Sequence, residues 1–234
     1  FSRGFAFDEI YDLGKLEGVH AWTYWSEQTD VLLWQQANSV TVSILRVDGL
    51  WLDRIFAFAA NVAVYVGQGT AGTGKVIDIG GLYADFCGRG LVCEGIGTHV
   101  AVANMFHLGQ KWGTTTTETV TGACSIHIAG GNNALIQVAN LYSTLTETAA
   151  VKVEGSYNQL WIASPIFAQY DRSGSAAGAI YATATNLCNL GAFPSLGVWG
   201  GGASYLVRGA PGGTVTRPTK QVVIGTKVIR VLSF

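Results

Sequence analysis

Charged residues are scarce in this chain. Asp, Glu, Lys and Arg make up 12% of its 234 residues, against about 25% in an ordinary globular domain. The formal net charge is −1 at pH 7, which lacks the strong basic excess typical of nucleic-acid binding, so we expect no nucleic-acid partner. Hydrophobic residues make up 49% of the chain. That fraction can supply a large core and apolar surface for another subunit to cover.

Long apolar runs are also missing. The longest, Ile55 to Val66, alternates like a strand and is too short to cross a bilayer, so we expect no membrane insertion. There is neither an initiating Met nor a signal-peptide pattern, and we expect a processed or partial piece of a longer chain. The cysteines have no metal-site or redox spacing, which predicts four buried free thiols and no bound metal. They are Cys87, Cys93, Cys124 and Cys188.

Catalytic and cofactor motifs are incomplete. Gly67–Gly72 matches a dinucleotide fingerprint, and Gly69–Lys75 matches most of a phosphate-binding loop. Both motifs need a helix to follow, because the amides at its N-terminus hold the phosphates. Here an alternating β-branched segment, 76–79, follows, and Val76 replaces the Ser or Thr that binds magnesium. The segment therefore predicts a loop between strands, with no cofactor. The four histidines have no metal spacing, and His127 lies within an alternating strand.

A short cassette recurs in the middle of the chain. Each copy has an alternating strand, a small residue, a turn former and an apolar–aromatic pair. The copies are 76–83, 99–106, 135–142 and a looser 160–167. From Leu82 to Met105, Leu141 and Ile166, they are spaced by 23, 36 and 25 residues. Such periods are typical of solenoids, so we expect these four side chains to stack inside a parallel β-solenoid.

A second cassette runs in phase with the first. It is a short alternating strand that ends in Gly: 64–67, 91–95, 126–130 and 151–155. Two strands per repeat, separated by a corner, make one turn of a parallel β-helix, with one face of each strand buried. A small residue allows the sharp corner. Asn104 and Asn140 are expected to stack at one such corner.

The two ends of the chain differ in charge. Residues 1–171 carry a net charge of −7, and residues 172–234 carry +6 with no acidic residue. We therefore predict a β-helix body over 1–185 and a C-terminal appendage over 186–234, Gly-rich and then basic and strand-like, acting as a cap or in oligomerisation. The only candidate helix is the charged opening, Asp8 to Glu17, which Gly14 interrupts.

At residues 1–5, 19–25 and 47–56 the chain resembles phage tailspike-like proteins with a pectate-lyase-type fold. The shared feature is a Val-His-x-Trp-x-x-Trp pattern, Val19 to Trp25. The resemblance covers roughly residues 1–170. It implies an all-β, right-handed, single-stranded parallel β-helix, usually trimeric. It further implies a place on a virion surface, or secretion, with other virion proteins and a host surface polysaccharide as partners.

Three aromatic residues are candidates for sugar binding: Trp22, Tyr24 and Trp25. Aromatic faces suit the apolar face of a pyranose, and alternation places Trp22 and Tyr24 on one side of a strand with Trp25 opposite. Aromatic residues on a β-helix turn also serve as core or as a subunit interface, where they contribute much of the binding energy. Both interpretations remain open.

Two classes of function follow. The first is a virion spike subunit, head- or tail-attached, that adsorbs to host polysaccharide. The second is a glycan hydrolase or lyase on the same scaffold, which would use paired carboxylates. Candidate carboxylates are Asp8, Glu9, Asp48, Asp53, Asp78, Asp85 and Glu94. The calcium-binding aspartates of pectate lyases and the catalytic motifs of polygalacturonases are not found, so the sequence favours the adsorption protein.

Overall fold

The computed structural model describes residues 2–22, 26–114, 118–130, 133–175, 178–183 and 186–190, together with five short strands between residues 195 and 228. Most of this part is β-strand, and nearly all strand pairs are parallel. The prediction of an all-β chain with parallel sheets is confirmed.

Two sheets make up the described body. Sheet A contains β1 (Arg3–Phe7), β4 (Val40–Ile44), β7 (Val62–Val66), β11 (Arg89–Cys93), β13 (Cys124–Ile128), β15 (Val151–Val153), β17 (Ile180–Ala182) and β20 (Val207–Gly209), in that order. Sheet B contains, in order, β2 (Ile10–Glu17), β5 (Val47–Asp53), β10 (Val76–Asp85), β12 (His99–Leu108), β14 (Leu135–Thr144), β16 (Gln159–Ala168), β18 (Leu187–Leu190) and β21 (Thr214–Thr216). Three shorter strands extend sheet B: β3 (His20–Ala21), β6 (Ile55–Phe58) and β19 (Ser195–Gly197).

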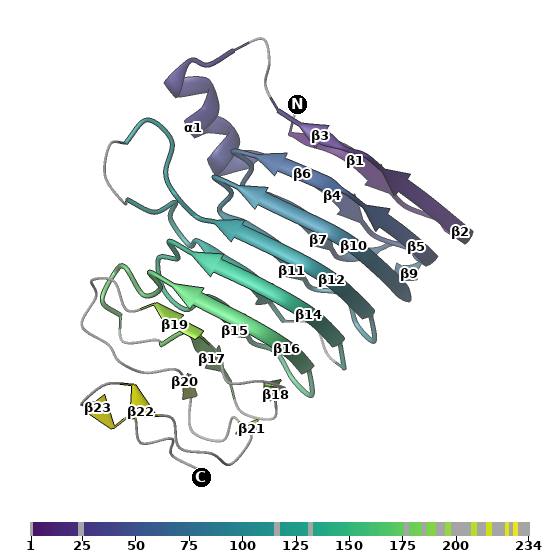
Figure 1. Cartoon of the computed structure of the whole chain (residues 1–234). Helices are drawn as coiled ribbons and strands as arrows, with labels where there is room; N and C mark the ends of the chain where they lie inside the picture. The colour runs from purple at the N-terminus through teal and green to yellow at the C-terminus, as the bar shows by residue number, and fades with distance from the viewer. Residues whose placement is uncertain are drawn as a thin grey trace.

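The chain passes from sheet A to sheet B and back again, and we call each such pass a rung. Every rung adds its strands beside those of the previous rung, so strands of one sheet lie side by side in a stack (Figure 1). In this order, the backbone N–H and C=O groups of each inner strand form hydrogen bonds with the strands on both sides. It leaves one face of each sheet to be buried between the sheets.

The core lies between the two sheets. Ile77, Val100, Ile136 and Leu160 stand opposite one another in successive strands of sheet B, and all four are fully buried. Burial of each such side chain contributes about 1.5–3 kcal/mol. The two asparagines predicted to stack also do so, because Asn140 Nδ2 donates to Asn104 Oδ1 at 3.1 Å.

The predicted interior stack is right at three positions and wrong at the fourth. Leu82, Met105 and Leu141 are in register and buried. Ile166 is 42% exposed, and Pro165 occupies the inner position opposite Leu141. The prediction aligned the copies by their apolar–aromatic pair. In the fourth copy that alignment is one residue out, and a one-residue shift moves a side chain to the other face.

The candidate helix at the start of the chain is a strand instead. Residues 10–17 form β2, which pairs in parallel with β5, and Gly14 lies close against Leu50. The only helix of the described part is α1 (Thr29–Asn38), which stands beside the ends of the sheet B strands (Figure 1). Pairing with a neighbouring strand therefore overrides the local charge pattern of the opening segment.

The remaining local predictions can also be placed. The glycine-rich segment 67–75 contains the hairpin β8 (Gln68–Gly69) and β9 (Gly72–Thr73), and strand β10 follows it. All four cysteines are buried free thiols, as predicted. Parallel pairing continues past residue 185 into β18, β20 and β21, and a second hairpin joins β22 (Val223–Ile224) to β23 (Lys227–Val228). A separate C-terminal appendage stays a prediction.

Candidate functional site

The outer face of sheet B carries a row of side chains that we call the tryptophan shelf. Strand register places its members opposite one another in five successive strands: Trp51, Asp78, Ala101, Gln137 and Trp161. Four strand-to-strand steps of about 4.8 Å separate the two tryptophans by roughly 19 Å. The shelf is therefore a run of small and polar side chains with an indole at each end.

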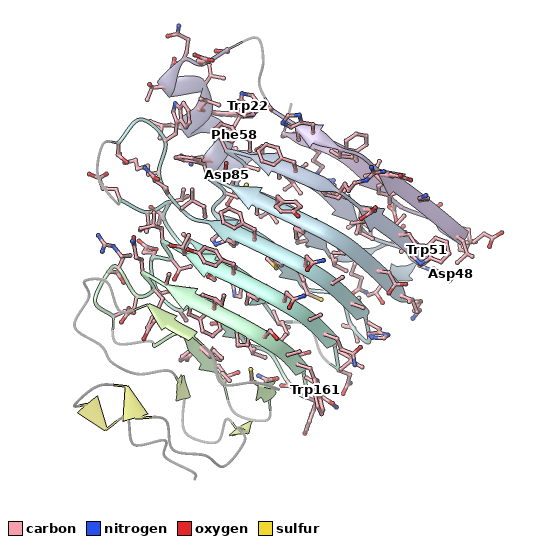
Figure 2. The ribbon with its side chains drawn as sticks, in the orientation of Figure 1. Trp22, Asp48, Trp51, Phe58, Asp85 and Trp161 are labelled. Atoms are coloured by element: carbon pink, nitrogen blue, oxygen red, sulfur yellow. The ribbon has the colours of Figure 1, made fainter. Side chains whose placement is uncertain are left out.

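Both indoles of the shelf are open to solvent. Trp51 is 53% exposed and Trp161 is 49% exposed. Figure 2 shows both on the side of the stack where the sheet B strands begin. Trp51 Nε1 donates to Asp78 Oδ2 at 3.0 Å, which fixes its ring. Trp161 makes no hydrogen bond or ring contact with the described residues, and it lines one of the hollows that adjoin the shelf.

Two hollows adjoin the shelf. One has a volume of about 500 Å³ and lies over the small residues Gly80, Ala103 and Ala139, with Trp161 in its wall. The other, of about 420 Å³, lies beside it along each strand and includes Asn104 and Asn140. The hollows form because β12, β14 and β16 each turn two consecutive small or amide residues outward: Ala103–Asn104, Ala139–Asn140 and Ala163–Ser164. Both volumes fall in the range of small-ligand sites.

A second row, the aromatic ladder, borders the hollows on the other side. It consists of His20, Phe56, Tyr83, Phe106 and Tyr142, each in register with the next. Phe106 and Tyr142 stack with centroids 5.5 Å apart and planes 6° apart. Phe106 and Tyr142 therefore cover one face of each other's ring, whereas His20 meets Phe56 edge to face with centroids 4.7 Å apart. We therefore expect the ladder to stabilise sheet B and to form a wall rather than a stacking platform.

The predicted sugar-binding aromatics lie elsewhere. Trp22 is 36% exposed and stacks on Phe58 with centroids 4.4 Å apart. It lies with Phe58 and Asp85 near α1, at the opposite end of the strands from Trp51 (Figure 2). One face of its indole is thus used in packing. Tyr24 and Trp25 lie outside the described residues. The role of all three in sugar binding stays a prediction.

The predicted carboxylates are dispersed over the described part, and several already have a partner. Asp8 accepts from the amides of Glu9 and Arg46, and Asp48 pairs with Arg46 at 2.7 Å. Asp53 lies 3.5 Å from Arg54, and Glu94 accepts from the Tyr65 hydroxyl at 2.7 Å. Burial raises the pKa of Asp85, which the backbone at Phe86 partly offsets. Within this set, Asp53 and Asp78 lie on the neighbouring strands β5 and β10, two register positions apart.

A buried imidazole–hydroxyl contact is excluded as a catalytic group. His107 contacts the carbonyl of Cys87 at 3.0 Å through Nε2 and the Ser125 hydroxyl at 3.2 Å through Nδ1. Ser125 in turn shares a hydrogen bond with Ser143. All three side chains are buried, and burial lowers the pKa of His107 to about 4. A substrate cannot reach them, so the contact holds the sheets together.

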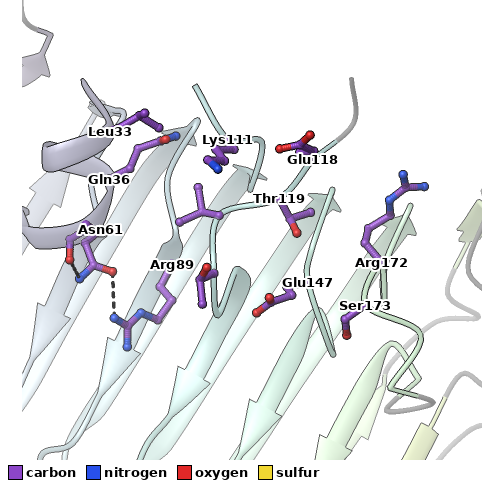
Figure 3. Close-up of a pocket in the computed structure, with 13 residues that line it drawn as sticks. Leu33, Gln36, Asn61, Arg89, Lys111, Glu118, Thr119, Glu147, Arg172 and Ser173 are labelled. Atoms are coloured by element: carbon purple, nitrogen blue, oxygen red, sulfur yellow. Dashed lines mark hydrogen bonds between the residues drawn. The ribbon is translucent and has the colours of Figure 1, made fainter. Parts of the chain in front are cut away.

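A third pocket lies at the corner where the chain leaves sheet B, and we call it the corner pocket (Figure 3). Its volume is about 850 Å³. Helix α1 forms one wall, segment 118–121 forms another, and the floor consists of turns from successive rungs. The charged side chains that line it are Arg89, Lys111, Glu118, Glu147 and Arg172.

Sequence reasoning missed both the shelf and the corner pocket. The strand register places Trp51, Asp78 and Trp161 in one row. The cassettes did not give this row, because Trp51 lies outside them and the fourth copy was aligned one residue out. The signal for the pocket was the 36-residue spacing between two copies, which reveals an inserted segment.

Two further observations limit the kind of site. The one helix of the described part, α1, is too short to span a membrane. Within the same part, His, Cys, Asp and Glu side chains do not gather in threes as a metal ion would require.

Comparison of this chain with protein-family models, with curated proteins and with solved structures finds no match in any of the three.

Proposed function

We propose that this chain is a spike subunit on the surface of a phage or phage-like particle, and that its body is a right-handed parallel β-helix that binds host polysaccharide. The alternation of the chain between two parallel sheets supports the β-helix. The open row of two tryptophans on sheet B supports binding of a chain-like ligand. The tailspike resemblance supports the biological setting.

The observation that carries the proposal is the spacing of Trp51 and Trp161. Two exposed indoles about 19 Å apart, in one strand register, offer stacking surfaces to a ligand that runs along the stack. Between them lie hydrogen-bonding groups, the Asp78 carboxylate and the Gln137 amide. A polysaccharide fits this pattern, because its rings have apolar faces and its edges carry hydroxyl groups.

Binding to a panel of bacterial capsular and lipopolysaccharide glycans tests the proposal. We expect the protein to bind at least one of them and Trp161→Ala to weaken that binding by about tenfold or more, since buried aromatic anchors dominate interfaces. Trp34→Ala is the matched control, because Trp34 on α1 is also 49% exposed but lies off the shelf. Equal loss in both variants, or no binding by the parent, would contradict the proposal.

The same protein and glycans distinguish the alternative function, a glycan depolymerase, from the adsorption protein. Incubation with the bound polysaccharide is followed by assays for new reducing ends and for unsaturated sugars. Release of either product would establish an enzyme on this scaffold. Binding without release supports the adsorption protein.

We further propose a homo-oligomer, most simply a trimer, with the copies side by side along the stack. The low charge of the chain and its −7/+6 division support this assembly, because a basic C-terminal segment can lie against the acidic body of a neighbour. Light scattering at micromolar concentration should give a mass above that of one chain. Deletion of 208–234, which removes β21 and most of β20 from the C-terminal edges of the sheets, should loosen the oligomer and leave the remaining strands folded. A stable monomer would refute the assembly.

A further inference from the structure

The corner pocket is built from two insertions that stand on a regular scaffold. The described residues of the first are 26–39, which contain α1, and those of the second are 109–114 and 118–123. Gln36 joins them: its Nε2 donates to the carbonyls of Phe86 and Gln110 at 2.7 and 2.9 Å, and its Oε1 accepts from Trp112 N at 2.9 Å. In repeat proteins, insertions that gather on one face often form the binding face. The walls of this pocket are therefore held in place rather than formed by loose loops.

The charges in the corner pocket are not balanced. Arg89, Lys111 and Arg172 line it, against the two carboxylates Glu118 and Glu147. Glu147 accepts a hydrogen bond from the backbone of Gly122, and its own amide donates to Ala123 O at 3.0 Å. That carboxylate therefore serves partly to fasten the returning end of the insertion.

Arg89 is the best placed of the three cations. It is half-buried, and its Nη2 donates to Asn61 Oδ1 at 2.9 Å, while Asn61 Nδ2 donates to Ala37 O at 2.9 Å (Figure 3). Among the described residues, no carboxylate lies within ion-pair distance of Arg89 or Lys111. A guanidinium offers five donors, so one neutral hydrogen bond leaves most of them for another acceptor.

We propose that the corner pocket is a second binding site, for a ligand that carries an oxyanion, with Arg89 as its main ion-pair partner. A carboxylate, sulfate or phosphate ester supplies the negative charge and the several acceptor oxygens that a guanidinium binds best. The hydroxyls of Thr119, Thr121 and Ser173 also line the pocket and offer donors to the rest of the ligand. The site does not depend on the tryptophan shelf.

Calorimetric titration of the full chain with four probes tests the class of ligand. The probes are inorganic phosphate, inorganic sulfate, glucuronic acid and glucose. We expect saturable binding of glucuronic acid or of an inorganic anion at or below about 10 mM, binding that weakens with added NaCl, and none of glucose. Binding of glucuronic acid alone points to an anionic sugar, whereas binding of the inorganic ions points to a simple oxyanion site. Binding of no probe overturns the proposal, and so does glucose binding that Arg89→Gln weakens as much as it weakens anion binding.

Variants locate the site. Arg89→Gln should weaken anion binding about tenfold or more, because charge-assisted hydrogen bonds are lost. Arg54→Gln is the matched control, since Arg54 is an exposed cation that pairs with Glu17 away from the pocket. Glu118→Gln should tighten binding severalfold, because it removes a like charge from the pocket wall. If Arg89→Gln and Arg54→Gln behave alike, or if Glu118→Gln weakens binding, the anion lies elsewhere.

Circular dichroism of each variant guards against misfolding. Arg89→Lys gives a second reading, because it retains the charge but loses the planar fork. Its affinity should fall between those of the parent and Arg89→Gln. If both Arg89 variants are folded and both retain the full affinity for the anion, Arg89 does not take part in binding.

Discussion

One corner of the stack, where the chain leaves sheet B and returns to sheet A, is built in two different ways. Two connections are short, 59–61 and 86–88, whereas two others are long, 22–39 and 109–123. The short connections keep neighbouring strands in register. The long ones leave the register of the strands intact but meet above the short ones and enclose the corner pocket. The short connections thus hold the strands in register, and the long connections form the walls of the pocket.

The regular connections share a backbone feature. In the two short connections and in those after β14 and β16, the residue that follows the sheet B strand has a positive φ of 52–54°. None of the four is glycine: Ala59, Phe86, Leu145 and Gln169. This conformation costs about 1–2 kcal/mol for a residue with a Cβ. The stacked strands on either side hold it in place. In the long connection after β12 the corresponding residue is Gly109, which does not have a positive φ, so this conformation accompanies the regular connections.

The largest effect is expected inside the regular part. Ile136→Ala removes a fully buried side chain from the central strand β14 and should lower the free energy of unfolding by about 2–5 kcal/mol. Gln137→Ala, the next residue, faces outward and should change it by less than about 0.5 kcal/mol. Urea unfolding measures both. Similar losses in the two variants would contradict the assignment of inner and outer faces.

The second effect is a pH dependence from the buried His107. Burial lowers the pKa of its imidazole from 6.5 to about 4, so the folded protein holds it neutral while the unfolded chain takes up a proton. The contribution of His107 to the free energy of unfolding is fully present above pH 6.5. It is lost as the pH falls toward 4, and the total loss is about 3 kcal/mol. Unfolding free energies at pH 4.5 and 7.5 for the parent and His107→Gln measure it. The parent should show the larger drop, and equal drops would contradict the prediction.

The third prediction tests whether the insertions open independently of the stacked strands. Gln36→Leu leaves two carbonyls and one amide without their partner and should cost about 1–3 kcal/mol. Hydrogen exchange should speed up in 109–114 and remain slow in β12 and β14, because the stack does not depend on this contact. Gln28→Leu, at an exposed position before α1, is the control. Faster exchange throughout the stack would show that the insertions are part of the same cooperative unit.

Much of the regular part could be predicted from the sequence. The first three cassettes have the register that their alignment gave, including the 36-residue interval. Alternation fixes which face is buried, so the inner residues follow directly. The fourth copy failed because the proline before Ile166 obscured the pattern. The positive φ angles at the corners could not be predicted, because none of the four residues that have them is glycine: Ala59, Phe86, Leu145 and Gln169.

The insertions were less predictable for physical reasons. Helix α1 buries only Leu32 and Gln36, so its sequence has little of the apolar periodicity that marks a helix. The long interval between cassettes shows that a segment is inserted but not where it packs. The contacts that place it, from Gln36 to the backbone around Gln110, join residues far apart in sequence. For the same reason the sequence pointed to Trp22 and not to the corner pocket.

The smallest effect concerns the asparagines at the outer corner of sheet B, which the sequence did identify. Asn140 is exposed, and its Nδ2 donates to Ala103 O at 3.3 Å and to Asn104 Oδ1 at 3.1 Å. Because water can replace both hydrogen bonds, Asn140→Ala should cost no more than about 0.5–1 kcal/mol in urea unfolding. A loss as large as that of Ile136→Ala would mean that the outer corner, and not the core alone, holds the rungs together. A small loss would mean that these stacked amides serve the outer surface, where they line a hollow beside the tryptophan shelf.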